Sequence, residues 1–219
     1  MKKYFQTIKN SKLFAGITEG EVEAMLQCLS ASVKTFKKGD IIYRAGENIS
    51  SVAMLLDGKI HIQKEDFWGN LSILDAVSPG ELFGEVFACL ENEPMAYNAE
   101  AVKDSAVLLL DVQRVLTTCT NACKFHARLI RNLLSAISDK NRVLTQKMLH
   151  MSQRTTREKL LSYLSEQSLK QGSPAFDIPF NRQQLADFLS VDRSAMSAEL
   201  GKMKNEGLLE FDKNHFVLR

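Results

Sequence analysis

Hydrophobic residues near the end of the chain recur at the spacing of two short helices with a sharp break between them. The pattern predicts helices on either side of residues 190–192, within the stretch 181–203. Asn181 and Asp192 stand where each helix would begin, and their side chains can accept hydrogen bonds from the free N–H groups there. The second helix has one apolar stripe, which consists of Met196, Leu200 and Met203.

The opposite face of this second predicted helix is polar and carries little bulk. Arg193, Ser194 and Ser197 share it with Ala198 and Gly201. A helix that is only solvated usually carries long charged side chains, whereas one that enters the major groove of DNA needs a low profile and a few donors near its N-terminal end. Together with a predicted hairpin over residues 208–218, this pattern indicates a winged helix-turn-helix.

Residues 31–111 have a different texture, with short apolar or alternating runs separated by glycine turns, after a helical stretch in the first thirty residues. Asp57-Gly58 predicts a hairpin between two of these runs, because Asp-Gly is typical of two-residue hairpin turns. Many short strands at this spacing favour an antiparallel sandwich, barrel or jelly roll, and hence an α+β chain. We expect strands at 33–36, 41–43, 52–56, 59–63, 71–77, 99–102 and 106–110.

A single long helix is predicted between residues 123 and 151, a stretch without Gly or Pro. Its apolar residues follow a heptad and form one seam along the helix, which predicts a coiled coil with a second copy of the chain. A single Asn in such a seam fixes the register of the two paired helices. The alternative is a long amphipathic helix packed within its own monomer. The seam consists of Cys123, Ala127, Ile130, Leu134, Ile137, Asn141, Leu144, Met148 and Met151.

Charge divides the 219 residues into three parts, although the whole chain carries only +2. The net charge is −5 for residues 1–111, +7 for 112–154 and zero for 155–219. We therefore expect a sensor domain, a dimerisation helix region and a DNA-binding domain with these bounds. The chain shows no secretory segment and no apolar run of roughly 18–20 residues, so we expect a cytoplasmic protein without a membrane span.

Four short motifs occur in a fixed order along this pattern: Phe36–Glu47, Leu55–Ile60, Ser78–Glu85, and a set of positions between 182 and 208 that includes Arg193. In this order they resemble the bacterial transcription factors of the cyclic-AMP receptor protein / fumarate-nitrate reduction regulator (Crp/Fnr) family, over nearly the whole chain. The resemblance implies a cyclic-nucleotide-binding-like β-roll, a dimerisation helix and a winged helix-turn-helix. It also implies double-stranded DNA, a second copy of the chain and RNA polymerase as partners.

The resemblance assigns roles to four residues of the helix pair. Arg193 holds the place from which an Arg reads guanine in the major groove, in keeping with bidentate contact to O6 and N7. Ser194 and Ser197 would add base or phosphate contacts, and Arg182 resembles a phosphate anchor. Many members carry a second Arg where this chain has Ala198, so one base pair should be read less strongly.

The sensor part departs further from the family pattern. Gly84-Glu85 is present, but residues 91–99 contain no Arg or Lys to neutralise a cyclic phosphate, and they include the acids Glu91 and Glu93. An unpaired phosphate in a partly buried pocket is costly. We therefore expect an effector other than cyclic AMP and leave any cofactor unidentified. The candidate effector pocket consists of Gly84, Glu85, Cys89 and Tyr97.

The sequence gives weaker support for an iron–sulfur cluster, a haem group, a catalytic site or a thiol switch. The four cysteines are too scattered for an iron–sulfur cluster, and His61 is the one histidine of the roll that haem binding would have to use. We find no nucleophile–base pair, phosphate loop or metal-ligand spacing, so we expect no catalysis and no metal site. Two alternatives remain: a cyclic-nucleotide-type sensor that acts mainly through protein–protein contacts, and a thiol switch built on Cys119 and Cys123.

Overall fold

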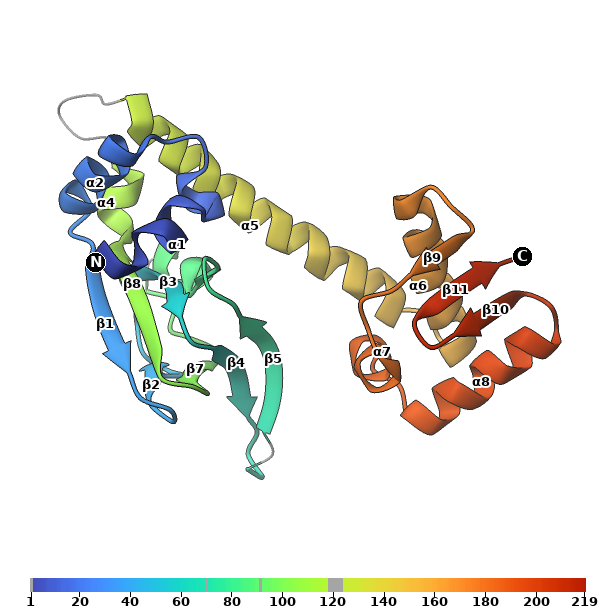
Figure 1. Ribbon diagram of the computed structural model, residues 1–219. Coiled ribbons are helices and arrows are strands. Elements are labelled where there is room, and N and C mark those ends of the chain that lie inside the picture. Colours follow the sequence, from blue (N-terminus) through green and yellow to red (C-terminus); the bar gives the residue numbers. More distant parts are fainter. Residues whose placement is uncertain (1, 70, 91, 118–123) are drawn as a thin grey trace. The chain divides into compact units, whose positions relative to one another are not determined.

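A computed structural model describes residues 2–69, 71–90, 92–117 and 124–219 (Figure 1). The chain divides into two compact units, residues 1–138 and 139–219, and the division falls inside the long helix α5 (Lys124–Met151). Each unit is described by itself below. The predicted helix agrees with α5 throughout its described residues, while Cys123 lies outside them.

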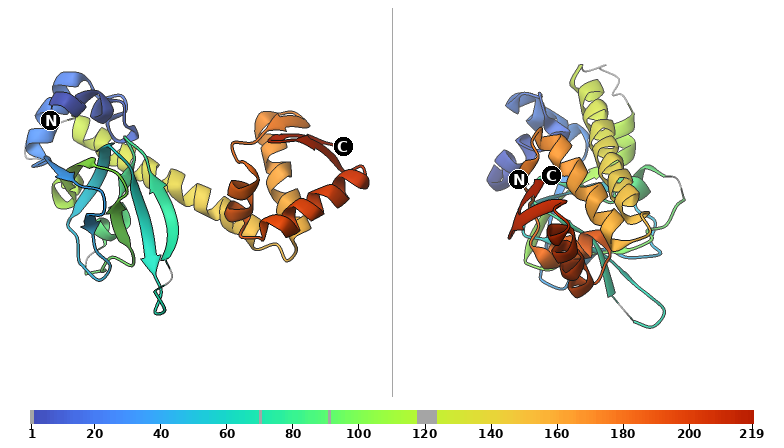
Figure 2. Two further views of the ribbon diagram at one scale, coloured as in Figure 1. Left: turned by 60° about the horizontal axis from the view of Figure 1, so that its bottom comes forward. Right: turned by 90° about the vertical axis from the view of Figure 1, so that its right-hand side faces the viewer.

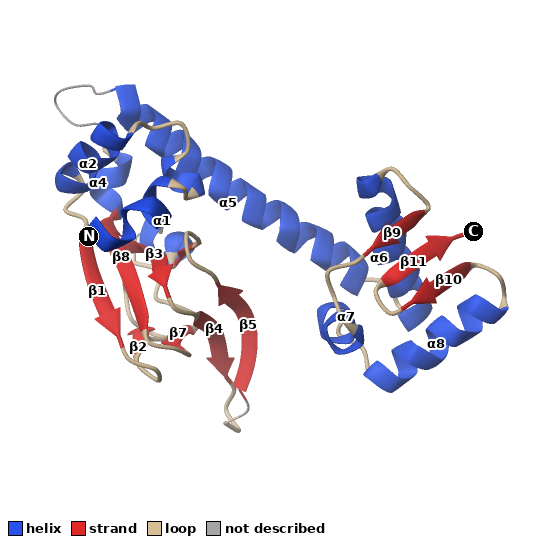
Figure 3. Cartoon of the chain, viewed as in Figure 1, coloured by secondary structure: helices blue, strands red, loops and turns tan. Residues whose placement is uncertain are grey.

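The first unit is built on two four-stranded antiparallel sheets, which confirms the expected β-roll (Figure 3). One sheet has the order β1-β8-β3-β6 and the other β2-β7-β4-β5. The sequence pattern did not reveal the two-residue strand β6. The strands are β1 Ser32–Phe36, β2 Ile41–Tyr43, β3 Ser51–Asp57, β4 Ile60–Glu65, β5 Leu71–Val77, β6 Leu82–Phe83, β7 Asn98–Ala101 and β8 Ser105–Asp111.

The hairpin predicted at Asp57-Gly58 is wrong. Strand β3 pairs with β6 and β8, whereas β4 pairs with β5 and β7, so the chain crosses between the sheets at this point. Gly58 has φ +99°, and a Cβ there would lie 2.6 Å from the Asp104 carbonyl oxygen and closer still to the Ser105 hydroxyl. A tight crossover needs a residue with positive φ just as a hairpin does, and the local sequence cannot distinguish them.

Helices α1 (Phe5–Lys9), α2 (Glu19–Cys28) and α4 (Val112–Leu116) gather with the first half of α5 at one end of β1 and β8 (Figures 1 and 2). Leu129 and Leu133 of α5 are buried in the core that these helices share with β3 and β8. The Asn132 amide also donates hydrogen bonds to the carbonyls of Leu13 and Ala15, at 2.9 Å each. The start of α5 is thus an integral part of the first unit.

The second unit is a winged helix-turn-helix, as predicted (Figure 3). Helix α6 (Thr156–Gln171) precedes the pair α7 (Arg182–Leu189) and α8 (Arg193–Asn205). Strands β9 (Ala175–Asp177), β10 (Leu209–Asp212) and β11 (His215–Leu218) form a sheet in the order β10-β11-β9. One apolar core joins the helices to the sheet; its fully enclosed members include Leu160, Leu164, Leu185, Leu189, Met196, Leu200, Met203, Leu209 and Phe216.

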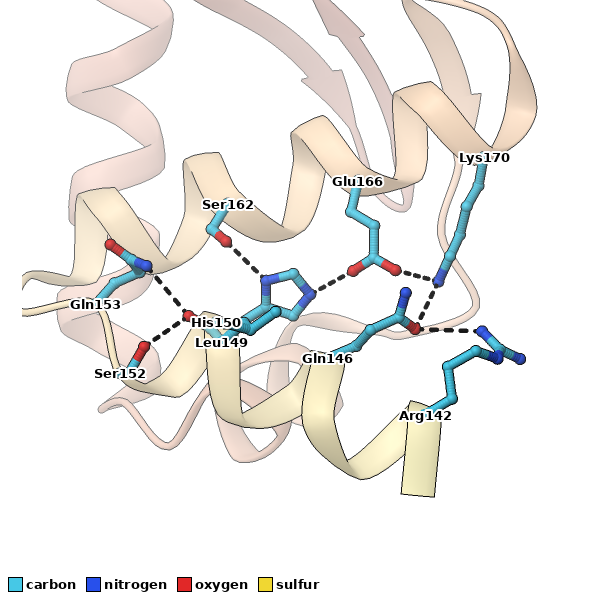
Figure 4. A network of polar contacts seen from close by, with 9 residues as sticks. All are labelled: Arg142, Gln146, Leu149, His150, Ser152, Gln153, Ser162, Glu166 and Lys170. Atoms are coloured by element: carbon cyan, nitrogen blue, oxygen red, sulfur yellow. Dashed lines mark hydrogen bonds and ion pairs between the residues drawn. The ribbon is translucent and has the colours of Figure 1, made fainter. Parts of the chain in front are cut away.

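A buried polar network holds the last turns of α5 against α6 within this unit (Figure 4). His150 Nε2 lies 2.5 Å from Glu166 Oε2, and His150 Nδ1 lies 2.8 Å from the Ser162 hydroxyl. Lys170 completes an ion pair with Glu166. Burial works against the charged form of Glu166, but its bonds with Lys170 and His150 outweigh burial and hold its pKa below the ordinary value.

The crossover at Gly58 yields a stability prediction. Gly58→Ala should be more destabilising than Gly39→Ala, because both residues have positive φ but only Gly58 has no room for a Cβ. Backbone strain common to both variants costs about 1–3 kcal/mol, and the steric clash should add about 1–3 kcal/mol at Gly58. Urea denaturation measures both. Equal destabilisation by the two substitutions would contradict the crossover geometry.

Candidate nucleic-acid interface

Local hydrogen bonds that we predicted from the sequence cap the first turns of both α7 and α8. The Asp192 carboxylate accepts a hydrogen bond from the Ala195 N–H at 2.8 Å, and the Asn181 side chain accepts one from the Gln184 N–H at 2.9 Å. Ser190, with φ +51°, makes the break between the helices. Both predicted caps are confirmed, and Arg193 is the first residue of the second helix.

Burial of one face of α8 leaves the other face in solvent. Met196, Leu200 and Met203 are fully buried, as the sequence pattern predicted. Arg193, Ser194, Ser197 and Ala198 are all exposed. The structure thus displays the low-profile polar face that a helix in the major groove requires.

A surface hollow of about 700 Å³ lies between this helix pair and the turn of the wing. Arg182, Arg193 and Lys213 all line it, and no lining residue within the described part of the chain is acidic. Lys213, with φ +51°, lies in the turn between β10 and β11. Sequence reasoning identified this turn but did not select Lys213 as a site residue, because its place beside Arg193 depends on how the wing folds back. The hollow is a concave cationic surface suited to phosphate oxygens.

Arg182 has a second role that the sequence did not indicate. Its guanidinium lies over the rings of Phe211 and Phe216, at 4.7 and 5.1 Å from their centroids. Burial lowers the pKa of this Arg below its ordinary value. Arg182 therefore links α7 to strands β10 and β11 through cation–π contacts while it lines the hollow. Its assignment as a phosphate anchor remains a prediction.

The residues predicted for the effector pocket lie together in the first unit. Gly84, with φ +75°, precedes α3 (Glu85–Cys89), and a Cβ there would lie 2.8 Å from the Tyr43 ring. Glu85 is buried, and its charge acts on both Cys89 and Tyr97. Burial, with Glu85 and Asp75 adding to it, raises the pKa of Tyr97 to about 12.

The chemistry of these residues does not favour a reactive thiol. Burial first, and then the charge of Glu85, raises the pKa of Cys89, whereas a thiol sensor needs a lowered pKa. Cys119 and Cys123 lie outside the described residues, so the thiol switch remains untested. Within the described ranges, no group of three His, Cys, Asp or Glu side chains could hold a metal ion.

The predicted seam of α5 is largely exposed. Leu134 and Met148 are exposed, and so is Asn141, whose side-chain oxygen accepts a hydrogen bond from the Thr145 hydroxyl at 3.2 Å. Ile130 and Ile137 are half-buried. The core of the first unit contains Leu129 and Leu133, which lie on another face of the helix, and of the seam residues Ile137 packs against this core. Most of the seam is therefore available to a partner.

Comparisons with known proteins agree with both units. Residues 33–121 match the cyclic nucleotide-binding domain, and residues 158–219 match the Crp-like helix-turn-helix domain. The chain is 26% identical over 216 residues to the cyclic AMP receptor protein of Thermus thermophilus, covering 92% of this chain and 89% of that one. It is 22% identical to the transcriptional activator protein FnrA of Stutzerimonas stutzeri, covering 81% and 72%.

Solved structures show the same fold. The structure of OCPA-complexed CprK aligns with a TM-score of 0.65 at 17% identity, covering 90% of this chain and 88% of that chain. The Thermus thermophilus catabolite activator protein aligns with a TM-score of 0.51 at 22% identity, covering 95% and 94%. At these identities the structures support the fold alone.

Fold, helix-turn-helix and domain matches together define a transcriptional regulator that joins a cyclic nucleotide-binding domain to a Crp-like DNA-binding domain. The chain belongs to the Crp/Fnr family. Members of this family are transcription factors and not enzymes, as we expected of this chain. Among the described residues, no helix is long and apolar enough to cross a membrane.

Proposed function

We propose that two copies of this chain bind an inverted repeat in double-stranded DNA and regulate transcription in response to an effector other than cyclic AMP. The observation that carries the proposal is the placement of Arg193. It is exposed at the first position of α8 and lines one cationic hollow with Arg182 and Lys213. Three cationic side chains, one of them at the start of α8, are thus gathered on one surface.

The chemistry of each group supports a division of roles on DNA. Arg193 offers a planar fork of donors that matches O6 and N7 of guanine. Ser194 and Ser197 lie on the same exposed face and can donate to bases or phosphates. Arg182 and Lys213 flank Arg193 in the hollow and hold the backbone. Ala198 supplies no donor, so the base pair beneath it contributes little specificity.

The exposed seam supports pairing through α5. Its apolar members follow a heptad, and Asn141 supplies the single polar position that sets register in a two-stranded coiled coil. Paired copies would present two α8 helices to successive major grooves, about 34 Å apart. An effector bound in the roll then alters DNA affinity by favouring one arrangement of the pair. RNA polymerase is the partner through which such a regulator acts on transcription.

The proposed exclusion of cyclic AMP rests on charge. Residues 92–99 supply no cation, and they include Glu93. Glu85 is buried beside Tyr97, and its charge already raises the pKa of that phenol. A cyclic phosphate placed here would meet negative charge, and residues 92–99 would offer it no cation, which is unfavourable at low dielectric.

Arg193→Ala should weaken sequence discrimination at one base pair of each half-site. Loss of one bidentate guanine contact costs about 1–3 kcal/mol and relaxes specificity at that base pair. Lys213→Ala serves as the matched cation control, and it should weaken binding to all sequences alike and reduce the salt slope by about one. Fluorescence anisotropy on specific and random duplexes measures both effects. Loss of affinity for all sequences in Arg193→Ala, without any change in preference, would argue against base reading.

Leu144→Asp should dissociate the pair, and Val143→Asp should not. The two neighbours are similarly exposed, at 61% and 53%, but only Leu144 lies in the seam. A carboxylate in a coiled-coil seam is desolvated without a partner, whereas one at Val143 stays in water. Sedimentation velocity reports the oligomeric state of each variant. A dimer that survives Leu144→Asp would show that the seam is not the interface.

Cyclic AMP should leave the thermal stability of the full chain unchanged. A ligand at a hundred times its dissociation constant adds about 2.7 kcal/mol to the free energy of unfolding. A thermal-shift titration to millimolar cyclic AMP, with cyclic GMP alongside, measures this. A concentration-dependent rise in Tm with cyclic AMP would overturn the charge argument and identify a nucleotide-gated regulator.

A further inference from the structure

An Arg on α6 holds the recognition helix α8 at two places. Arg157 Nε donates to Glu199 Oε1 at 2.6 Å, and its Nη2 contacts both carboxylate oxygens of Glu206, at 2.6 and 2.7 Å. Glu199 lies in the middle of α8, and Glu206 is its C-cap residue. The two acids are seven residues apart, or about two turns, so they lie on one face of the helix. The guanidinium therefore fixes the helix at two points along its axis.

The central contact of this clamp, between Arg157 and Glu199, is partly buried. The Glu199 side chain is only 17% exposed, and Lys202 is a second, more distant partner at 3.5 Å. The hydrogen bond from Arg157 is the largest cause that lowers the pKa of Glu199 below its ordinary value. Since Glu199 stays charged at neutral pH, the clamp is complete under the conditions in which DNA is bound.

The apolar stripe of α8 specifies orientation less tightly than such a clamp does. Two of its three members, Met196 and Met203, have unbranched side chains that adapt to small shifts. A planar guanidinium bound to two carboxylates tolerates much less rotation. Base reading by Arg193 is sensitive to this rotation because a bidentate contact needs both donors aligned with one base edge.

Helix α6 is itself anchored, which makes it a suitable platform. His150 joins it to the last turns of α5 through Ser162 and Glu166 (Figure 4). Lys159 of α6 donates to the Leu189 carbonyl at 3.3 Å, at the end of α7. Within the second unit, α6 thus connects the end of α5 with both helices of the helix-turn-helix.

We propose that Arg157 is a positioning residue for DNA recognition, which holds α8 on α6 in the orientation that presents Arg193 to base edges. It contacts no base and acts through Glu199 and Glu206. The inference rests on the proposed function, since it requires that α8 reads DNA. Its signature is a loss of specificity, because nonspecific affinity depends on phosphate contacts that tolerate a small rotation of α8.

The test compares full-length Arg157→Ala and Arg157→Lys with a control, Arg219→Ala. Arg219 also bonds a glutamate at 2.6 Å, but this pair is exposed and joins the residue after strand β11 to Glu210 of β10. An operator selected with the unaltered protein and a random duplex are titrated at 25 °C, with circular dichroism to verify folding. The ratio of specific to nonspecific affinity should fall about tenfold in Arg157→Ala, as when a bidentate base contact loses its alignment. It should fall less in Arg157→Lys and stay unchanged in Arg219→Ala.

Each outcome of this experiment supports or overturns the positioning role of Arg157 or the proposed function. A folded Arg157→Ala protein with an unchanged ratio overturns the positioning role, as does an equal loss in Arg219→Ala. If Arg157→Ala is unfolded at 25 °C, Glu206→Gln weakens one of the two anchors by removing its charge and one of its two acceptor oxygens, and its ratio is judged by the same criterion. Failure of the unaltered protein to bind any selected DNA would instead defeat the proposed function. Specific binding that is lost in Arg193→Ala but kept in Arg157→Ala defeats the positioning role alone.

Discussion

Burial of one face of α8 is the constraint on which the DNA-binding surface depends. Met196, Leu200 and Met203 are enclosed by α6, α7 and the small sheet, so Arg193, Ser194 and Ser197 can only face outward. The Asp192 cap sets the residue at which the helix begins and therefore which side chain comes first. The wing brings Lys213 to the same hollow. A single apolar core thus determines which polar groups are offered to a partner.

Helix α5 packs into the core of the first unit with one face and leaves another apolar face exposed. Leu129 and Leu133 enter the core of the first unit, while Leu134 and Leu144 remain in solvent. Its final turns belong to the second unit, where His150 is buried against α6. A helix shared by both units and by a proposed partner is a physical route by which events in the roll can influence DNA binding. Such coupling requires that the effector favours one arrangement of the pair over another.

The sequence predicted the structural features that neighbouring residues determine, and it did not predict those that depend on residues far apart in the chain. The caps at Asn181 and Asp192 and the stripe of α8 depend on neighbouring residues, and all were predicted. Asp57-Gly58 was misinterpreted because strand pairing depends on distant segments. The neighbours of Lys213, and the partners of Arg157 and His150, arise only from tertiary packing, so no spacing rule could reveal them. For α3 and β6, a few residues are too short a stretch for a periodic signal.

The most direct test of the central claim is selection of binding sites from randomised duplex DNA by the full-length protein, followed by sequencing of the retained fraction. Two α8 helices that each present Arg193 predict an inverted repeat with a guanine in each half-site and half-site centres about 10 base pairs apart. Enrichment of such a repeat would establish paired recognition helices. A retained fraction without symmetry, or with no enriched sequence at all, would contradict the account.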